Sequence, residues 1–406
     1  MRRIDPRNFR VARRGTTREI NRSIALNLIR AHQPISRADL ARIMGTRRGA
    51  VSLLVNELLA ERAVFEGATG EARRGRKPKF LYIDSRQRCV VAVDMRATRT
   101  SVMVTDLVGR QLASVTSFPT EREPKRFVAD LVKRIKTLLT EHKDLGRCQG
   151  VGVVVPGMVD FGSGRVLLTP NLGWRDVQLR EPLAAGLGLP VFLENSGRAC
   201  ALAQAWSTRS EGGTPQSLVF VSVSDGLGVG IVMGGELVRG QNNIAGEFGH
   251  VPLSIDGPRC ACGATGCWEA YVSNLATLSR YFGRDLRGPK PLPAEAAQLT
   301  VDDLIARARS GDGKALQALQ ATARYLGLGL GALVNAIDPS RIYLGGEITA
   351  AWDLIEATVR AGLKERALTE AAGAAPIQVV PLESYPRLRG AAALVSAPAF
   401  AAPVVA

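Results

Sequence analysis

Apolar positions near the start of the chain recur at the spacing of short amphipathic helices. Thr16 and Glu19 form a capping-box pattern, which predicts the start of a helix. Pro34 would end that helix, because proline has no backbone N–H to donate within it. The residues expected on its buried face are Ile20, Ile24, Leu28 and Ile29.

Two further helices joined by a short turn are expected next. Ser36 and Asp39 predict the start of a short helix that ends at Gly45. Its buried residues would be Leu40 and Ile43. A third helix is expected from about Thr46, with a buried stripe made of Val51, Leu54, Val55 and Leu58. Two helices joined by a turn that contains glycine form a helix-turn-helix.

A pair of short strands follows and extends this prediction to a winged helix-turn-helix. The strands are expected at 63–66 and 80–83, and the loop between them carries Arg73, Arg74, Arg76 and Lys77. A hairpin with cations at its tip suits DNA phosphates or the minor groove. The other side chains expected to contact DNA are Ser36, Arg37, Thr46, Arg47, Arg48 and Ser52. The alternative is a three-helix protein-interaction module with a flexible basic loop.

From Cys89 onward the pattern changes to strand-like apolar runs that later alternate with helices. Strands are expected at 89–94, 100–106, 111–115, 150–155, 190–193 and 218–223, with a hairpin through Ile231 and Leu237 and a helix at about 124–142. This order indicates an α/β body with mixed sheets. Gly327, Gly329 and Gly331 stand in a helix-like run before a strand, so they predict close helix packing and not a dinucleotide site.

Charge divides the 406 residues into the same two parts. Residues 1–84 contain 19 Lys and Arg against 8 Asp and Glu, a net charge of +11, which leaves 16 − 11 = +5 for the remainder. A strongly basic unit on a nearly neutral body predicts a polyanion partner, although a solvated arginine-rich face is the alternative. No apolar run approaches the ~20 residues of a membrane span. The start of the chain lacks a signal-peptide pattern, and the clustered cysteines suit a reducing compartment, so a cytoplasmic location is expected.

Metal-ligand side chains concentrate in one glycine-rich stretch. His250, Cys260, Cys262 and Cys267 fall within eighteen positions, and they include half of the six cysteines and one of the three histidines. Four such ligands can close a tetrahedral Zn²⁺ site, which would be structural because it leaves no open position. Three chance cysteines on a glycine loop, with or without a disulfide, are the alternative.

The body resembles the ROK family of sugar kinases and sugar-responsive repressors, and the family's repressors also carry an N-terminal winged helix. The resemblance rests on the cysteine loop, the stretch Ala245–His250, and the segments 155–160 (VPGMVD), 170–174 (PNLGW), 194–195 (EN) and 344–346 (LGG). It implies an actin-like, ribonuclease H-like fold of two lobes. The expected fold class is therefore α/β, with a winged helix-turn-helix, a two-lobed sugar-kinase body and a structural zinc loop. The expected parts are a DNA-binding domain (1–84), a first lobe (88–196, with 388–406 returning to it) and a second lobe with the zinc loop, ligand site and oligomerisation surface (197–387).

Three departures from the family's kinases predict that the chain is not an enzyme. Ser196 follows Glu194 and Asn195 where the kinases carry their catalytic Asp, and a hydroxyl is no base at neutral pH. The first phosphate loop, residues 94–98 (DMRAT), lacks the glycines that let a backbone approach phosphate. Asp225 stands in the second phosphate loop, where a carboxylate repels phosphate.

By the same resemblance, a sugar would be bound by Gly157, Asn195, Glu247, His250 and Glu269, although surface carboxylates are the alternative for the two glutamates. The expected function is a sugar-responsive repressor of genes for carbohydrate uptake or metabolism. Its partners would be double-stranded operator DNA, a sugar or sugar derivative, and further copies of the chain in a homodimer or homotetramer. An ATP-dependent sugar kinase with a DNA-binding domain is one alternative. A DNA-binding protein whose body recognises another protein is a second.

Overall fold

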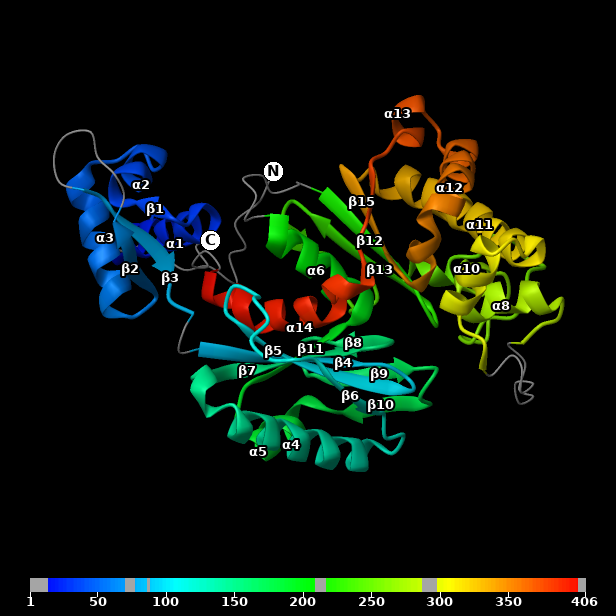
Figure 1. The fold of residues 1–406 in the computed structure, drawn as a ribbon, viewed down its shortest axis with the longest axis horizontal. Coiled ribbons are helices and arrows are strands. Elements are labelled where there is room, and N and C mark those ends of the chain that lie inside the picture. Colours follow the sequence, from blue (N-terminus) through cyan, green and yellow to red (C-terminus); the bar gives the residue numbers. More distant parts are fainter. Residues whose placement is uncertain (1–13, 70–76, 86–87, 209–216, 287–297, 401–406) are drawn as a thin grey trace.

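The computed structural model describes residues 14–69, 77–85, 88–208, 217–286 and 298–400, which form a small N-terminal unit and a two-lobed body (Figure 1). The N-terminal unit contains α1 (Arg14–His32), β1 (Ile35–Ser36), α2 (Arg37–Ile43), α3 (Arg48–Ala60), β2 (Val64–Thr69) and β3 (Lys79–Ile83). Its strands form an antiparallel sheet in the order β1-β3-β2. The predicted winged helix-turn-helix is confirmed.

The core of this unit follows the apolar stripe of α3, because Val51, Leu54, Val55 and Leu58 are all buried as predicted. Ser36 caps α2, since its Oγ accepts the backbone N–H of the third helical residue at 3.1 Å.

Three predictions about the N-terminal helices are wrong. The helix α1 begins two residues before Thr16, which is buried within it, and Ile24 and Ile43 are 43% and 49% exposed. For Ile24 the reason is that α1 buries the face with Ala25, Leu26 and Ile29, which packs in one core with Trp206 and Phe400 of the body. Ile43 is the last residue of α2, which buries Leu40 and Ala41 instead.

The first lobe is built on a five-stranded sheet in the order β11-β7-β4-β5-β6. Its strands are β4 (Arg88–Met95), β5 (Arg99–Asp106), β6 (Thr116–Pro119), β7 (Arg147–Val155) and β11 (Val191–Asn195). β4, β7 and β11 are parallel and covered on both sides, which explains their continuous valine runs. One face is covered by α4 (Pro124–Glu141) and α5 (Arg180–Leu187) and the other by α14 (Pro386–Ser396), while η1 (Lys143–Leu145) precedes β7 (Figure 1).

The strand predicted at 111–115 is wrong. The chain turns at Gly109, where φ is 88°, and Gln111 forms only an isolated bridge with Thr105. The third strand of the sheet begins at Thr116 instead. A small antiparallel sheet that was not predicted follows β7, with strands β8 (Met158–Asp160), β9 (Arg165–Thr169) and β10 (Trp174–Gln178).

The second lobe contains a five-stranded sheet in the order β14-β13-β12-β15-β16. Its strands are β12 (Ser217–Val223), β13 (Leu227–Met233), β14 (Glu236–Leu237), β15 (Arg341–Gly346) and β16 (Ile377–Val379). Its helices are η2 (Phe248–His250), α7 (Glu269–Val272), α8 (Asn274–Phe282), α10 (Val301–Arg309), α11 (Gly313–Ile337), η3 (Glu347–Ala351), α12 (Trp352–Arg366), α13 (Glu370–Gly373) and η4 (Leu382–Ser384). A Cβ on Gly327 would lie 2.2 Å from the Val359 carbonyl oxygen of α12, which confirms the predicted close helix packing.

Two helices connect these parts. α6 (Ser196–Thr208) packs against α14 on one side and against β12 and β13 on the other. α14 places Leu388, Ala391 and Ala392 in a core with strands of the first lobe, so the C-terminal segment returns to that lobe. The short helix η5 (Ala397–Phe400) follows it. None of the helices in the described ranges is long and apolar enough to cross a membrane.

Candidate functional site

A cavity of about 90 Å³ lies between the two lobes, where β7 and β11 of the first lobe end opposite the β12–β13 turn of the second. Its lining includes every residue that the sequence predicted to contact a sugar, namely Gly157, Asn195, Glu247, His250 and Glu269. The structure therefore brings together residues that are up to 112 positions apart. Lining residues absent from the predicted set include Arg96, Asn171, Ser196, Asp225 and Arg387.

Asn195 joins the cavity to the start of α6. Its side-chain amide donates to the Gly157 carbonyl at 2.7 Å, and its Oδ1 accepts the backbone N–H groups of Gly197 and Arg198 at 2.8 and 3.2 Å. Asn195 is thus the N-cap of α6, which explains why an asparagine suits the end of β11. Gly157 has φ of 123°, and a Cβ there would lie 2.2 Å from the Leu168 carbonyl oxygen. This glycine is required for the backbone to pack.

A buried ion pair supports this junction from behind. Glu194 is fully buried, and its carboxylate accepts from Arg198 Nε at 2.7 Å and from Arg239 Nε at 2.9 Å. Arg198 is only 1% exposed and also donates to the Asn243 carbonyl at 2.8 Å. Glu194 Oε1 accepts the Asn195 N–H at 2.9 Å as well, so the triad holds Asn195 in place.

Two glycines position Glu247 and His250 on the opposite wall. A Cβ on Gly246 would lie 2.7 Å from the Val229 carbonyl oxygen, and one on Gly249 would lie 2.5 Å from that of Leu227, both in β13. The segment can therefore press against β13, with Glu247 and His250 both partly buried in the cavity. His250 Nε2 lies 3.8 Å from the Glu247 carboxylate. Burial raises the pKa of the Glu247 carboxyl above its usual value.

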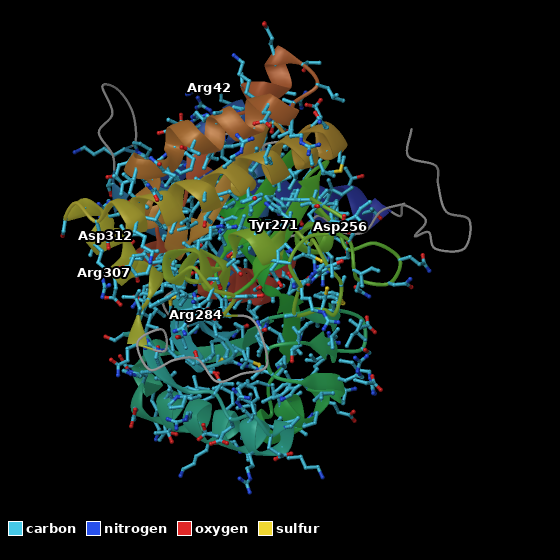
Figure 2. The ribbon with its side chains drawn as sticks, turned by 90° about the vertical axis from the view of Figure 1, so that its right-hand side faces the viewer. Arg42, Asp256, Tyr271, Arg284, Arg307 and Asp312 are labelled. Carbon is cyan, nitrogen blue, oxygen red and sulfur yellow. The ribbon has the colours of Figure 1, made fainter. Side chains whose placement is uncertain are left out.

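Glu269 fixes the turn between β12 and β13. Its Oε2 accepts the Leu227 N–H at 2.8 Å, and a Cβ on Gly226 would lie 2.6 Å from that oxygen. Two residues later in α7, Tyr271 stacks on Tyr325 of α11 with ring centroids 4.5 Å apart. Figure 2 shows Tyr271 centrally in the lobe, away from the labelled arginines. The second lobe thereby holds the Glu269 carboxylate at the cavity.

The four predicted metal ligands come together beside this carboxylate. His250 Nδ1 lies 3.7 Å from Cys260 Sγ, and the sulfurs of Cys262 and Cys267 are 3.8 Å apart. All four ligand atoms lie within 4.8 Å of one another, and all six cysteines of the chain are free. Metal–sulfur bonds of ~2.3 Å in a tetrahedron place neighbouring sulfurs about 3.8 Å apart. The donor set and its spacing therefore fit a tetrahedral metal ion.

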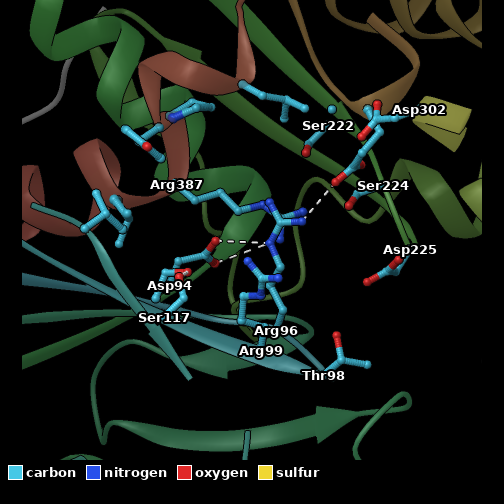
Figure 3. Close-up of a pocket in the computed structure, with 18 residues that line it drawn as sticks. Asp94, Arg96, Thr98, Arg99, Ser117, Ser222, Ser224, Asp225, Asp302 and Arg387 are labelled. Atoms are coloured by element: carbon cyan, nitrogen blue, oxygen red, sulfur yellow. Dashed lines mark hydrogen bonds and ion pairs between the residues drawn. The ribbon is translucent and has the colours of Figure 1, made fainter. Parts of the chain in front are cut away.

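A second cavity of about 500 Å³ adjoins the first, and Arg96 lines both of them (Figure 3). Arg96 Nε lies 3.2 Å from Asp94 of the first lobe, and its Nη1 lies 2.9 Å from Glu347 of the second lobe. Burial alone would raise the pKa of the Glu347 carboxyl, but the Arg96 guanidinium outweighs it and holds that pKa below its usual range. Arg96 thus ties the two lobes together.

Some of the residues predicted to face DNA are exposed, and others interact with neighbouring residues of the protein. Thr46, Arg47 and Arg48 are exposed at the start of α3, and Lys77 is exposed beside β3. A surface cavity of about 560 Å³ is lined by Ser36, Arg37, Ala38, Arg48, Ser52, Glu66, Lys77, Pro78 and Lys79. Ser36 is buried as the cap of α2, and Arg37 pairs with Glu66 at 2.9 Å. Arg73, Arg74 and Arg76 lie outside the described residues.

The residues missed by sequence reasoning had unequal signals. Asn171 belongs to the segment PNLGW that carried the family resemblance, so it could have been included. The sequence shows that Arg96 lies in a loop without the expected glycines, but nothing in it indicates that the Arg96 side chain reaches Glu347. Arg387 had no local signal, because only the return of α14 to the first lobe brings it to the cavity.

Comparisons with known proteins agree with this geometry. Residues 90–397 match the ROK family. The xylose repressor of Bacillus subtilis (strain 168) is 29% identical over 362 residues, which are 89% of this chain and 90% of that protein. A glucokinase of Streptomyces coelicolor is 31% identical over 285 residues, 68% of this chain and 86% of that protein.

Two solved structures repeat the distinction between regulator and kinase. A ROK family transcriptional regulator, described as a homologue of the E. coli MLC protein, has a TM-score of 0.77 and 25% identity, covering 95% of this chain and 97% of its own. A ROK family glucokinase from Streptomyces griseus, in complex with glucose and AMPPNP, has a TM-score of 0.64 and 27% identity, covering 75% of this chain and 98% of its own. On the family match over most of its length, the protein belongs to the ROK family.

Proposed function

We propose that the protein is a sugar-responsive transcriptional repressor that binds operator DNA through its N-terminal winged helix-turn-helix. The observation that carries this proposal is the union of a winged helix and a two-lobed ROK body in one chain (Figure 1). A regulator of known structure is similar to this chain over 95% of its length, and xylose repressors are among the relatives of this chain. On the names of these relatives, we propose an aldose of the xylose type as the effector, and genes for carbohydrate uptake or metabolism as the regulated genes. Such a repressor acts in the cytoplasm, where the DNA is.

The cavity between the lobes is the proposed sugar site. Asn195, Glu247, His250 and Glu269 offer polar atoms from both lobes to this cavity. Buried polar groups that lose their partner are costly, so a site of this kind rejects a sugar that lacks one of the matching hydroxyls. Because the site spans the lobes, a bound sugar favours one arrangement of them over another.

His250, Cys260, Cys262 and Cys267 would hold a structural Zn²⁺ ion. With four protein ligands the metal has no open position, and its contribution is to fold the loop. His250 Nδ1 faces the sulfur cluster while Nε2 faces Glu247, so a single side chain belongs to both the metal centre and the sugar site. The ring orientation of His250 at the cavity is thereby set by the metal.

The body is proposed to lack kinase activity. Ser196 stands where a carboxylate would take the hydroxyl proton, and Arg96 bridges Asp94 and Glu347 across the cleft that would receive a nucleotide. The second candidate is an ATP-dependent sugar kinase, which the 31% identity to a glucokinase favours. An ATP-coupled assay with glucose, xylose and other aldoses separates the two, with a kinase relative as positive control. Turnover by the wild-type chain would establish the kinase.

DNA recognition is assigned to the exposed end of α3 and to the wing. Arg47, Arg48 and Thr46 would reach base edges or phosphates, together with Ser52, Arg37 and the wing cations, while Ser36 acts through the cap of α2. The proposed domains are 1–84, 88–196 with 388–406, and 197–387. A homodimer or homotetramer would present two winged helices to two half-sites.

Selection of bound sequences from a random DNA pool, with and without D-xylose, tests this function. We expect a recovered sequence with two half-sites, and a loss of recovery when the sugar is present. The assay uses the full-length chain, and an Arg47→Ala/Arg48→Ala variant serves as the control for non-specific capture. Recovery of no preferred sequence would refute the repressor.

A further inference from the structure

We propose that α6 and α14 together carry the effect of sugar binding from the cavity to the N-terminal DNA-binding unit. This inference rests on the proposed function and names the elements through which the sugar regulates DNA binding. Both helices begin at the cavity, and both lead toward the N-terminal unit (Figure 1). Three sets of contacts support it, one at each end and one between.

At the cavity, both helices expose their first turns to the ligand site. Ser196 is the first residue of α6 and lines the cavity, and the side chain of Asn195 caps the helix. Arg387 is the second residue of α14, lines the same cavity and lies 3.9 Å from Asp94. A sugar that bonds to Asn195 therefore acts directly on the hydrogen bonds that begin α6.

Along their length, α6 and its neighbours touch backbone to backbone. A Cβ on Gly390 of α14 would lie 2.1 Å from the Ala199 carbonyl oxygen of α6. A Cβ on Gly230 of β13 would lie 2.2 Å from the Gly197 carbonyl oxygen of α6. α6 is thus held between α14, which belongs to the first lobe, and β13 of the second lobe. Because such close-packed elements move as bodies, a change in the separation of the lobes shifts α6.

At the far end, one cluster made of Arg30, Trp206 and Phe400 fastens α1 to α6 and to η5, the short helix that directly follows α14. The Arg30 guanidinium lies 3.8 Å from the centroid of the Trp206 ring at the end of α6, and 5.4 Å from that of Phe400. Asn27 of α1 donates to the Phe400 carbonyl at 2.7 Å. The three members of the cluster are between 5% and 7% exposed. Cation–π contacts of this buried kind are stronger than exposed ones.

α6 is long enough to connect the cavity with the N-terminal unit. Trp206 lies ten positions after Ser196, which corresponds to about 15 Å of helix at ~1.5 Å per residue. A helix of this length displaced at its first turn moves its last turn, and the Arg30–Trp206–Phe400 cluster passes that motion to the helix-turn-helix. Coupling between two sites typically changes affinity by about 5- to 150-fold, so a sugar effect on DNA binding within this range is expected.

The test removes the cluster without touching either binding site. Arg30→Met replaces the buried guanidinium with an apolar side chain of similar length. The control is Arg360→Met, the same replacement at an exposed ion pair of α12. Sugar affinity is measured by calorimetry, and operator affinity by fluorescence anisotropy, with and without saturating sugar from an aldose panel that includes D-xylose and D-glucose. We expect the sugar affinity and the sugar-free operator affinity of Arg30→Met to stay within about 3-fold of those of the wild type. The ratio of its operator affinities without and with sugar should fall to nearly one. Arg360→Met should retain the wild-type change.

The outcomes separate this inference from the function on which it rests. If wild type responds to a sugar and Arg30→Met responds equally, the helix path is overturned and the repressor stands. If no aldose alters wild-type DNA binding, the proposed function fails and the path with it. Should Arg30→Met not fold, hydrogen exchange of the wild-type protein decides, since sugar must alter exchange in residues 25–30 and 200–206. Unaltered exchange in both segments would overturn the proposal.

Discussion

The replacement Arg198→Met tests whether the buried triad behind Asn195 stabilises the body and its proposed sugar site. Arg198 is 1% exposed and Glu194 is fully buried, with their charged atoms 2.7 Å apart. The variant leaves the Glu194 carboxylate with the Arg239 guanidinium and the Asn195 N–H, and it deprives the Asn243 carbonyl of a donor at 2.8 Å.

The expected loss of stability follows from that burial. Removing one member of a buried ion pair costs about 3–5 kcal/mol where the remaining charge is left without a partner, but here Glu194 keeps Arg239. The loss should therefore be smaller, about 1–3 kcal/mol, which is the cost of buried polar groups that lose one partner. The unfolding free energy of the body should fall by this amount, which corresponds to about 2–4 °C of melting temperature per kcal/mol in a body of this size. The exposed pair Arg360–Glu356 offers the matched control, since Arg360→Met should cost at most about 0.5 kcal/mol.

Urea unfolding followed by circular dichroism measures both variants, with sugar affinity by calorimetry as a second readout. Sugar binding should weaken in Arg198→Met even where the protein is folded, because Glu194 also accepts the Asn195 N–H. If the two arginine variants unfold at the same urea concentration, the triad does not stabilise the fold.

Three further predictions concern the metal, the DNA and the turn at the cavity. Cys262→Ser should lower the metal content from about one zinc per chain to near zero and weaken the sugar response, and full metal content by elemental analysis would contradict the site. Arg48→Ala should weaken binding to all DNA sequences and reduce the slope of log affinity against log salt by about 1 if it contacts a phosphate; an unchanged slope would place it elsewhere. Gly157→Ala should abolish sugar binding or folding, because its Cβ would lie 2.2 Å from the Leu168 carbonyl oxygen. Gly173→Ala is its control, since that glycine also has positive φ (72°) but no heavy atom within 4 Å of a Cβ, and an equal effect of both would refute the packing argument.

Local features of the fold were predictable to the extent that they depend on neighbouring residues. The cap at Ser36 and the buried stripe of α3 follow from contacts within one or two turns, and both were found as expected. The wrong assignment of Ile24 has a different origin. Which side of an amphipathic helix is buried depends on what packs against it, and α1 packs partly against Trp206, far along the chain.

By itself the sequence determined the chemistry that is available: one histidine and three cysteines of metal-ligand type at short spacing, the hydroxyl of Ser196 after Asn195, and the family to which the body belongs. These features depend on residue type and short spacing, and short spacing limits how far apart ligands can lie. Only the tertiary structure decided that Arg96 reaches Glu347, 251 residues away, and that Arg30 reaches Trp206, 176 residues away. Contacts over such separations arise from how two lobes and a helical unit pack, and no local pattern encodes that packing.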